Sequence, residues 1–176
     1  MNHADLVALI RDGVPAKGGR WADLGAGEGA FTRALADLVG PGAHITAVDK
    51  DAGSLRRLDS AAGKAASMIE TLVSDFTRAL HLTNLDGVLM ANSLHFVRDK
   101  EPVLRSVRDM LRPGGTLIVV EYDADRGNPW VPYPLSYRNW QRLAAAVGFD
   151  QTRQFGSYPS RYLRSMYGAV SSRPRQ

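Results

Sequence analysis

Three glycines at alternate positions, with acidic neighbours, are the clearest chemical signal in this chain. Residues 23–29 read Asp-Leu-Gly-Ala-Gly-Glu-Gly, so the glycines are Gly25, Gly27 and Gly29. Glycine lacks a Cβ, so it adopts positive φ and lets a ligand approach its backbone closely. The residues before the loop predict a buried strand, and a helix is expected from about residue 28. Because open α/β sheets bind ligands at such strand ends, we expect a nucleoside-containing cofactor here.

The spacing of the glycines and their acidic neighbours bears on which cofactor is expected. A dinucleotide-binding loop reads Gly-x-Gly-x-x-Gly and holds a pyrophosphate at the helix N-terminus. Here the third glycine comes one residue early, and the carboxylates of Asp23 and Glu28 would repel a pyrophosphate. They suit a cationic ligand such as S-adenosylmethionine, which carries a sulfonium and an ammonium and no phosphate. A tight strand-to-helix turn without a ligand is the competing interpretation.

The composition limits the remaining chemistry. The chain has 176 residues, 44% hydrophobic and 23% charged, which predicts one globular domain over residues 1–176. It contains no cysteine, which excludes disulfides, thiolate metal sites and cysteine nucleophiles. The histidines at 3, 44 and 81 show no metal-ligand spacing, so no metal is expected. Because a signal-peptide pattern and a membrane-spanning apolar run are both missing from the sequence, a cytoplasmic location without membrane contact is expected.

The positive charge is concentrated near the end of the sequence. The formal net charge is +4, and residues 138–176 hold seven arginines and a single acid, Asp150. A solvated surface is the simpler interpretation, and a contact surface for an anionic substrate, nucleic acid or acidic lipid is the alternative. No aromatic-interleaved RNA-binding motif accompanies these arginines, which disfavours nucleic acid as a partner.

Strand and helix patterns alternate along most of the chain. Strands are expected at residues 20–24, 44–48, 68–74, 85–91 and 116–122, and helices at 4–11, 28–39, 52–64, 99–111 and 135–147. This alternation predicts parallel strands joined by right-handed crossovers. Two short strands at 151–155 and 162–170 have no helix between them, so they should pair antiparallel. The predicted fold is a single-domain, Rossmann-like doubly wound α/β sheet, mostly parallel with an antiparallel C-terminal edge.

Together these segments resemble the class I S-adenosylmethionine-dependent methyltransferases, over roughly residues 4–122 and more loosely beyond. The glycine loop looks like the first motif of that family, and four later motifs lie at residues 48–51, 74–76, 92–96 and 111–117. The order and spacing of all five carry the resemblance. It implies S-adenosylmethionine as cofactor and a small molecule as substrate. The Asn/Asp-Pro-Pro-aromatic motif of the amino-methylating branch is missing at residues 91–94.

The resemblance assigns the ribose and adenine contacts to residues that follow the second and third strands. Asp49, with Lys50 beside it, would accept both ribose hydroxyls. Asp75 would accept from the adenine amine, and Phe76 would supply an apolar wall or a backbone amide. A helix cap at Asp49 and a turn aspartate at Asp75 are the competing interpretations.

The remaining candidates concern the methyl donor and its acceptor. Asn92 would face the methionine ammonium unless it is only a turn residue, and Asp23 would fix the glycine loop or that ammonium. His95 is the candidate catalytic residue, as a general base near pH 7, with a pocket-shaping role as its alternative. Aromatic residues in the loop after the fifth strand predict a substrate pocket lined by Trp130 and Tyr133, unless that loop packs on itself.

The expected function is therefore in-line transfer of a methyl group to a small molecule. The leaving group is already good, so the protein mainly aligns the acceptor and excludes water. Three alternatives stay open: a non-catalytic cofactor-binding partner or regulator, an RNA or protein methyltransferase that uses the arginine-rich end, and a nicotinamide-binding domain. Members of the resembled family carry a longer N-terminal cover, so we expect the first helix, residues 123–134 or the second subunit of a homodimer to cover the site.

Overall fold

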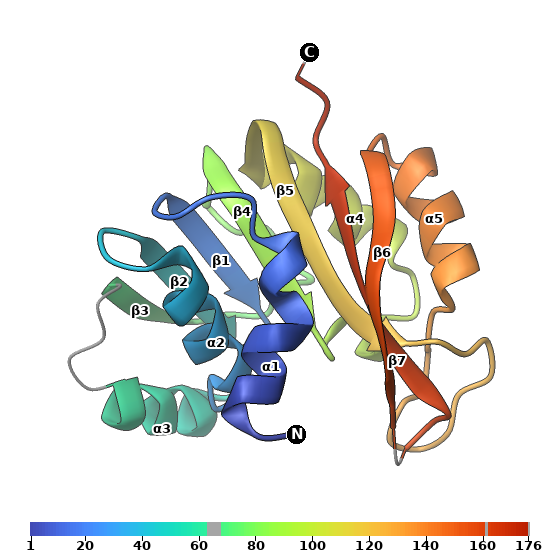
Figure 1. Ribbon diagram of the computed structural model, residues 1–176, viewed down its shortest axis with the longest axis horizontal. Coiled ribbons are helices and arrows are strands. Elements are labelled where there is room, and N and C mark those ends of the chain that lie inside the picture. Colours follow the sequence, from blue (N-terminus) through green and yellow to red (C-terminus); the bar gives the residue numbers. More distant parts are fainter. Residues whose placement is uncertain (63–67, 161, 176) are drawn as a thin grey trace.

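The computed structural model describes residues 1–62, 68–160 and 162–175, which form three layers with a sheet between helices (Figure 1). Within these residues seven strands form one sheet in the order β3-β2-β1-β4-β5-β7-β6. The strands are β1 (Arg20–Leu24), β2 (His44–Asp49), β3 (Met68–Val73), β4 (Leu85–Ala91), β5 (Leu111–Tyr122), β6 (Asp150–Pro159) and β7 (Ser165–Ser172). The first five are parallel, and β7 pairs antiparallel with both β5 and β6. The predicted doubly wound α/β sheet with an antiparallel edge is confirmed.

Helices cover both faces of this sheet (Figure 1). One face carries α1 (His3–Ile10), α2 (Ala30–Val39) and α3 (Ala52–Ala62), and the other carries α4 (Glu101–Met110) and α5 (Tyr137–Ala146). The central strands are apolar on both sides because both sides are buried. In β5, Ile118 and Val120 share an apolar cluster with α1 and α2, whereas Leu117 and Val119 share one with α4 and α5.

The two strands at the centre of the sheet and the helix after the first of them lie close to their predicted positions. β1 and β4 have the predicted bounds, 20–24 and 85–91. The helix expected from residue 28 begins instead at Ala30. The reason is the left-handed backbone of Gly29 (φ 77°), which stands outside the helix as its N-cap.

Other elements differ at their ends. α5 begins at Tyr137, two residues later than expected, because the side chain of Ser136 caps it. β5 begins at Leu111, five residues earlier than expected, with residues 112–115 outside its regular register with β4. The end of the helix expected at 52–64 lies outside the described residues.

The strand order reverses between β1 and β4. From β1 the chain passes to β2 and β3 on one side, and then to β4 and β5 on the other. In open α/β sheets a ligand crevice forms at such a reversal, beyond the carboxyl ends of the strands. The loops that follow β1, β2, β3 and β4 meet at this place.

Two absences apply to the part of the chain that the structure describes. None of its helices is long and apolar enough to cross a membrane. In the same ranges, no group of three or more histidine, aspartate or glutamate side chains is placed to hold a metal ion.

Candidate functional site

A cavity of about 260 Å³ lies at the carboxyl ends of the parallel strands. Its lining comes from the glycine loop and from the segments after β2, β3 and β4: Gly25, Asp49, Lys50, Ser74, Asp75, Phe76, Thr77, Asn92, Ser93, Phe96 and Val97. Most of the predicted cofactor contacts are therefore brought together. Asp23, Gly27 and Gly29 are not among the lining residues.

The three glycines of the loop meet different surroundings. A Cβ on Gly25 would overlap the side chain of Ser93, and a Cβ on Gly29 would overlap that of Leu58 in α3. These two glycines therefore let the segment after β4 and helix α3 pack against the loop. A Cβ on Gly27 would meet no protein atom within 4 Å, although its φ of 53° is left-handed. Gly27 thus faces open space, which leaves room for a ligand.

Asp49 ends β2 and binds the glycine loop. Its Oδ2 accepts the N–H of Gly27 at 2.8 Å, and its Oδ1 accepts the N–H of Asp51 at 2.9 Å. The carboxylate also lines the cavity, where each oxygen keeps capacity for a further donor. The cap of α3 is a different residue, Asp51, whose carboxylate accepts from the N–H of Gly53 and the hydroxyl of Ser54.

Asp75 and Phe76 form the wall after β3. Oδ1 of Asp75 accepts the hydroxyl of Thr77 at 2.7 Å and its N–H at 2.9 Å. These hydrogen bonds hold the pKa of Asp75 below its usual value. The group is therefore an ionised acceptor at neutral pH, which suits an amino-group donor. Phe76 is half-buried and packs against the core cluster on the α4 side.

Two buried polar atoms at the cavity have no hydrogen-bond partner within the described residues. They are Oδ1 of Asn92 and Oγ of Ser93, in the segment after β4. The backbone of Asn92 is left-handed (φ 54°), and its N–H donates to the carbonyl of Val120. An unpaired buried polar group costs about 1–3 kcal/mol, so a ligand with suitable polar groups would stabilise this wall.

Asp23 lies in the protein interior beneath the loop. Its Oδ2 accepts the hydroxyl of Thr32 at 2.7 Å, which joins β1 to α2. Burial raises the pKa of Asp23 to about 7, with the Thr32 hydrogen bond opposing the shift and the charge of Asp49 adding to it. This placement supports the loop-fixing interpretation rather than direct contact with a ligand.

His95, the predicted base, is paired with a glutamate that sequence reasoning missed. Nδ1 of His95 lies 2.9 Å from Oε2 of Glu121 in β5, and the N–H of His95 donates to Oε1 at 3.0 Å. Both side chains are almost fully buried. When Nδ1 donates to Glu121, Nε2 is the nitrogen that accepts a proton. His95 itself is not among the lining residues, whereas the adjacent Phe96 is.

Trp130 and Tyr133 are not among the lining residues either. Both are exposed, to 68% and 40% respectively. The N–H of Tyr133 donates to the carbonyl of His95 at 3.0 Å, which holds this part of the loop against the segment after β4. The side chain of Asn128 accepts from the N–H groups of Trp130 and Val131, so the loop is also folded on itself. A substrate pocket lined by the two aromatic residues stays a prediction.

Sequence reasoning missed two kinds of residue at this site. Most missed lining residues adjoin predicted ones, namely Ser74, Thr77, Ser93 and Phe96, and the fifth is Val97. Glu121 carried a signal, because it is the acid inside the apolar run 117–122.

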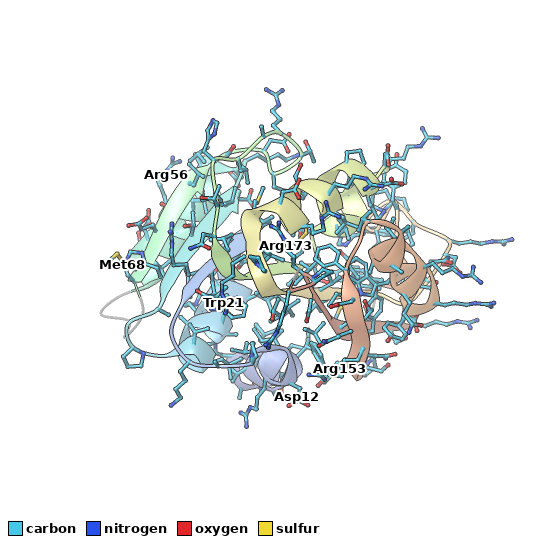
Figure 2. The ribbon with its side chains drawn as sticks, turned by 90° about the horizontal axis from the view of Figure 1, so that it is seen from above. Asp12, Trp21, Arg56, Met68, Arg153 and Arg173 are labelled. Carbon is cyan, nitrogen blue, oxygen red and sulfur yellow. The ribbon has the colours of Figure 1, made fainter. Side chains whose placement is uncertain are left out.

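Two of the C-terminal arginines bind the protein's own backbone. Arg173 donates to the carbonyls of Arg108 and Leu111, at the end of α4. Arg153 donates to the carbonyl of Asp12, and Figure 2 shows the two residues close together. These contacts favour structural roles for both arginines over contact with an anionic partner.

Comparisons with known proteins agree with this geometry. The family model described as a methyltransferase domain matches residues 22–117, more than half of the chain. The ubiquinone/menaquinone biosynthesis C-methyltransferase UbiE of Ectopseudomonas mendocina is 33% identical over 118 residues, which cover 64% of this chain and 44% of that protein. The highly reducing polyketide synthase aurA of Calcarisporium arbuscula is 27% identical over 172 residues, 83% of this chain and 7% of that protein. The chain therefore spans less than half the length of these two relatives.

A similar fold is found among solved structures. The crystal structure of a SAM-dependent methyltransferase from Aquifex aeolicus aligns with a TM-score of 0.74 at 18% identity, covering 96% of this chain and 89% of that one. At this identity the similarity concerns the fold, and it agrees with the sheet order described above.

Proposed function

The chain belongs to the class I S-adenosylmethionine-dependent methyltransferases, and from that premise we propose that it methylates a small molecule. The observation that carries the proposal is the cavity at the strand reversal. There Asp49, Asn92 and Ser93 line one space, and Oδ1 of Asn92 and Oγ of Ser93 are buried at its wall without a hydrogen-bond partner in the described residues. The UbiE relative is a C-methyltransferase of quinone biosynthesis, which supports a small molecule as acceptor.

The residues at the cavity fit S-adenosylmethionine. The free acceptor capacity of Asp49, with Lys50 beside it, suits the two ribose hydroxyls. Asp75 suits the adenine amine, and Phe76 gives an apolar wall for the base. Oδ1 of Asn92 suits the methionine ammonium. These assignments are proposals that follow from the chemistry of the donor and acceptor groups.

In this proposal no side chain of the protein forms a covalent intermediate during catalysis. Bound S-adenosylmethionine supplies a methyl carbon on a sulfonium, which an acceptor attacks in line while the carbon–sulfur bond breaks. The protein holds the acceptor in that line and keeps water out. Where the acceptor is not ionised, Nε2 of His95 accepts its proton, and Glu121 orients the imidazole through Nδ1. Trp130 and Tyr133 would form the wall on the acceptor side.

Other parts of the proposal rest on the sequence alone. They are the single domain over residues 1–176, the cytoplasmic location and the homodimer as a cover for the site. A non-catalytic cofactor-binding protein and an RNA or protein methyltransferase are the alternatives. The arginines that bind backbone carbonyls make the second of these less favoured.

Calorimetry with S-adenosylhomocysteine tests the proposed cofactor site. The wild type should bind, Asp49→Asn should bind more weakly, and Asp109→Asn should bind like the wild type, because Asp109 is exposed on α4 away from the cavity. Binding of NAD in place of S-adenosylhomocysteine would contradict the proposal. A metabolite screen that detects S-adenosylhomocysteine formation then tests catalysis, and cofactor binding without turnover would favour the non-catalytic alternative.

A further inference from the structure

Lys100 is a buried lysine outside the cavity, exposed to only 8%. It stands immediately before α4, and its side chain turns inward rather than to solvent. Lysine is rarely buried unless its ammonium is paired, because a buried unpaired charge is costly. A specific arrangement of acceptors must therefore hold this ammonium.

The acceptors come from two segments that are distant in sequence. Nζ of Lys100 donates to the carbonyl of Val97 at 2.7 Å and to the carbonyl of Tyr133 at 2.8 Å. Val97 lines the cavity, whereas Tyr133 belongs to the loop between β5 and α5. Lys100 thus joins the wall of the cavity to that loop.

Both backbone polar groups of Tyr133 are hydrogen-bonded to the segment 95–100. Its carbonyl accepts from Lys100, and its N–H donates to the carbonyl of His95 at 3.0 Å. Nζ of Lys100 also lies 5.9 Å from the centre of the Tyr133 ring, within the range of a cation–π contact. Elsewhere the loop is held by other contacts, such as Asn128 with the carbonyl of Tyr162. The end of the loop near Tyr133 is therefore the part that depends on Lys100.

The ammonium belongs to a buried polar group behind the cavity. Burial lowers the pKa of Lys100, and the charge of Glu121 opposes that shift. Glu121 in turn holds the ring and the N–H of His95. The lysine, the glutamate and the histidine thus connect β4, β5 and the loop after β5 at one place.

We propose that Lys100 is a positioning residue, which holds the end of the loop near Tyr133 beside the cofactor cavity, where this part of the loop forms the acceptor wall. Lys100 acts through the carbonyls of Val97 and Tyr133, because it does not itself line the cavity. The inference rests on the proposed function, since that function makes the loop an acceptor wall. Loss of the ammonium should release the loop and leave the cofactor contacts in place.

Hydrogen exchange of Lys100→Met tests the release. Methionine keeps most of the stem packing and removes the ammonium. The amide of Tyr133, which donates to the carbonyl of His95, should exchange about tenfold faster or more, as expected for local opening at this end of the loop, while the sheet amides stay protected. Lys17→Met is the control, because Lys17 lies at the amino-terminal ends of the central strands, away from the loop, and should leave the loop unchanged. Unchanged loop exchange in Lys100→Met, or faster exchange spread evenly over the sheet, would overturn the proposal.

Cofactor binding separates this inference from the proposed function. S-adenosylhomocysteine should bind Lys100→Met within about twofold of the wild-type affinity, a difference of a fraction of RT. A wild type that does not bind the compound would refute the proposed function and leave the exchange result interpretable. A tenfold loss of affinity in Lys100→Met would contradict the claim that Lys100 holds the loop without affecting the cofactor contacts.

Chemical rescue shows whether the ammonium or the packing matters. The chain has no cysteine, so Lys100→Cys can be alkylated at one site in denaturant and refolded. Alkylation with 2-bromoethylamine restores an ammonium at the length of lysine, and 1-bromopropane gives the same length without charge. The aminoethyl adduct should restore slow loop exchange and the propyl adduct should not. Equal rescue by both, or by neither, would contradict a role for the ammonium.

Discussion

The N–H of Gly27 donates to the carboxylate of Asp49 at 2.8 Å, so the residue that ends β2 holds the glycine loop and also faces the cavity. The second oxygen of the same carboxylate accepts the N–H of Asp51, which fixes its rotation. One side chain thus sets the loop geometry and presents acceptors to a ligand. Changes at Asp49 should therefore affect both stability and affinity.

Replacing Asp49 should weaken cofactor binding more than it weakens the fold. Asp49→Asn keeps the shape but loses charge-assisted hydrogen bonds, worth about 1.5–3 kcal/mol each, so affinity for S-adenosylhomocysteine should fall about tenfold or more. Asp49→Ala also leaves the N–H groups of Gly27 and Asp51 without their acceptor, and the free energy of unfolding should fall by about 1–3 kcal/mol. Calorimetry and urea denaturation measure the two effects. Wild-type affinity in both variants would remove Asp49 from the site.

Substitutions at the loop glycines should distinguish the glycine that leaves space for the ligand from the glycine that permits close packing. Gly27→Ala adds a Cβ that meets no protein atom, so only its left-handed backbone is strained, at a cost of about 1–3 kcal/mol. Gly25→Ala also overlaps Ser93 and should destabilise the protein more. Gly27→Val should fold but lose binding of S-adenosylhomocysteine, because its branched Cβ fills the approach of the ligand. Thermal melts and calorimetry of the three variants check this order, and unchanged affinity in Gly27→Val would exclude the loop from the site.

Asp23 should make stability fall with rising pH in a defined window. Its pKa is about 7 in the folded protein against an ordinary value of 3.8, because burial favours the protonated form. Between those values the unfolded chain has lost a proton that the folded protein retains. The stabilisation is complete below the lower value, decreases by up to about 1.4 kcal/mol per pH unit, and is gone above the upper one.

Asp23→Asn provides the comparison for this effect, because asparagine keeps an acceptor for Thr32 and does not titrate. Urea denaturation of both proteins from pH 5 to pH 8 gives the difference between their unfolding free energies. That difference should shift in favour of the variant up to about pH 7 and then level off. Parallel curves over the whole range would show that Asp23 ionises normally.

His95 and Glu121 should be separable by turnover and stability. Removing one partner of a buried pair costs about 3–5 kcal/mol, so Glu121→Gln, which keeps the shape, should be less harmful than His95→Ala. With an acceptor from the screen, a base role predicts a fall in rate in His95→Ala that disappears at high pH, where the acceptor ionises unaided. His44→Ala, on the exposed start of β2, is the control. A fall in rate that is independent of pH would indicate a pocket-shaping role instead.

Trp130 and Tyr133 should matter for turnover and little for stability. Both are exposed, and replacing exposed side chains usually changes unfolding free energy by no more than about 0.5 kcal/mol. The alanine variants should keep wild-type affinity for S-adenosylhomocysteine and lose turnover of the acceptor. Wild-type turnover in both would show that these two side chains do not line the acceptor site.

The sheet and the cavity wall could be predicted because they depend on local patterns. Apolar runs followed by glycine or asparagine predicted the bounds of β1 and β4, and the parallel strand order brought Asp49, Asp75 and Asn92 to one end of the sheet. The predicted start of α2 at residue 28 was two residues too early, because the helix pattern included Gly29. Its backbone is left-handed, and a Cβ there would overlap the side chain of Leu58, which is distant in sequence.

The side-chain partners could not be predicted, because they join segments that only the fold brings together. The contact of Lys100 with the carbonyl of Tyr133 depends on the path of an irregular loop, and the sequence of such a loop has no hydrophobic periodicity from which its path could be predicted. The acid in β5 could have been noticed, but its pairing with His95 depends on how β4 and β5 lie side by side. A residue at a strand end lines the cavity or lies beneath it according to the direction of its side chain. The side chain of Asp23 points to Thr32 in α2 and so lies beneath the loop.

β7 follows β6 in sequence yet lies between β5 and β6 in the sheet. During synthesis β6 therefore leaves the ribosome with no strand to pair with, and it must wait for residues 165–172. Until then the β5 backbone at residues 116–122 is an open edge next to apolar side chains, a surface prone to pairing with other chains. Completion of the sheet thus waits for the last strand in the sequence, and slowed translation just before β7 would prolong the period in which the incomplete sheet can aggregate.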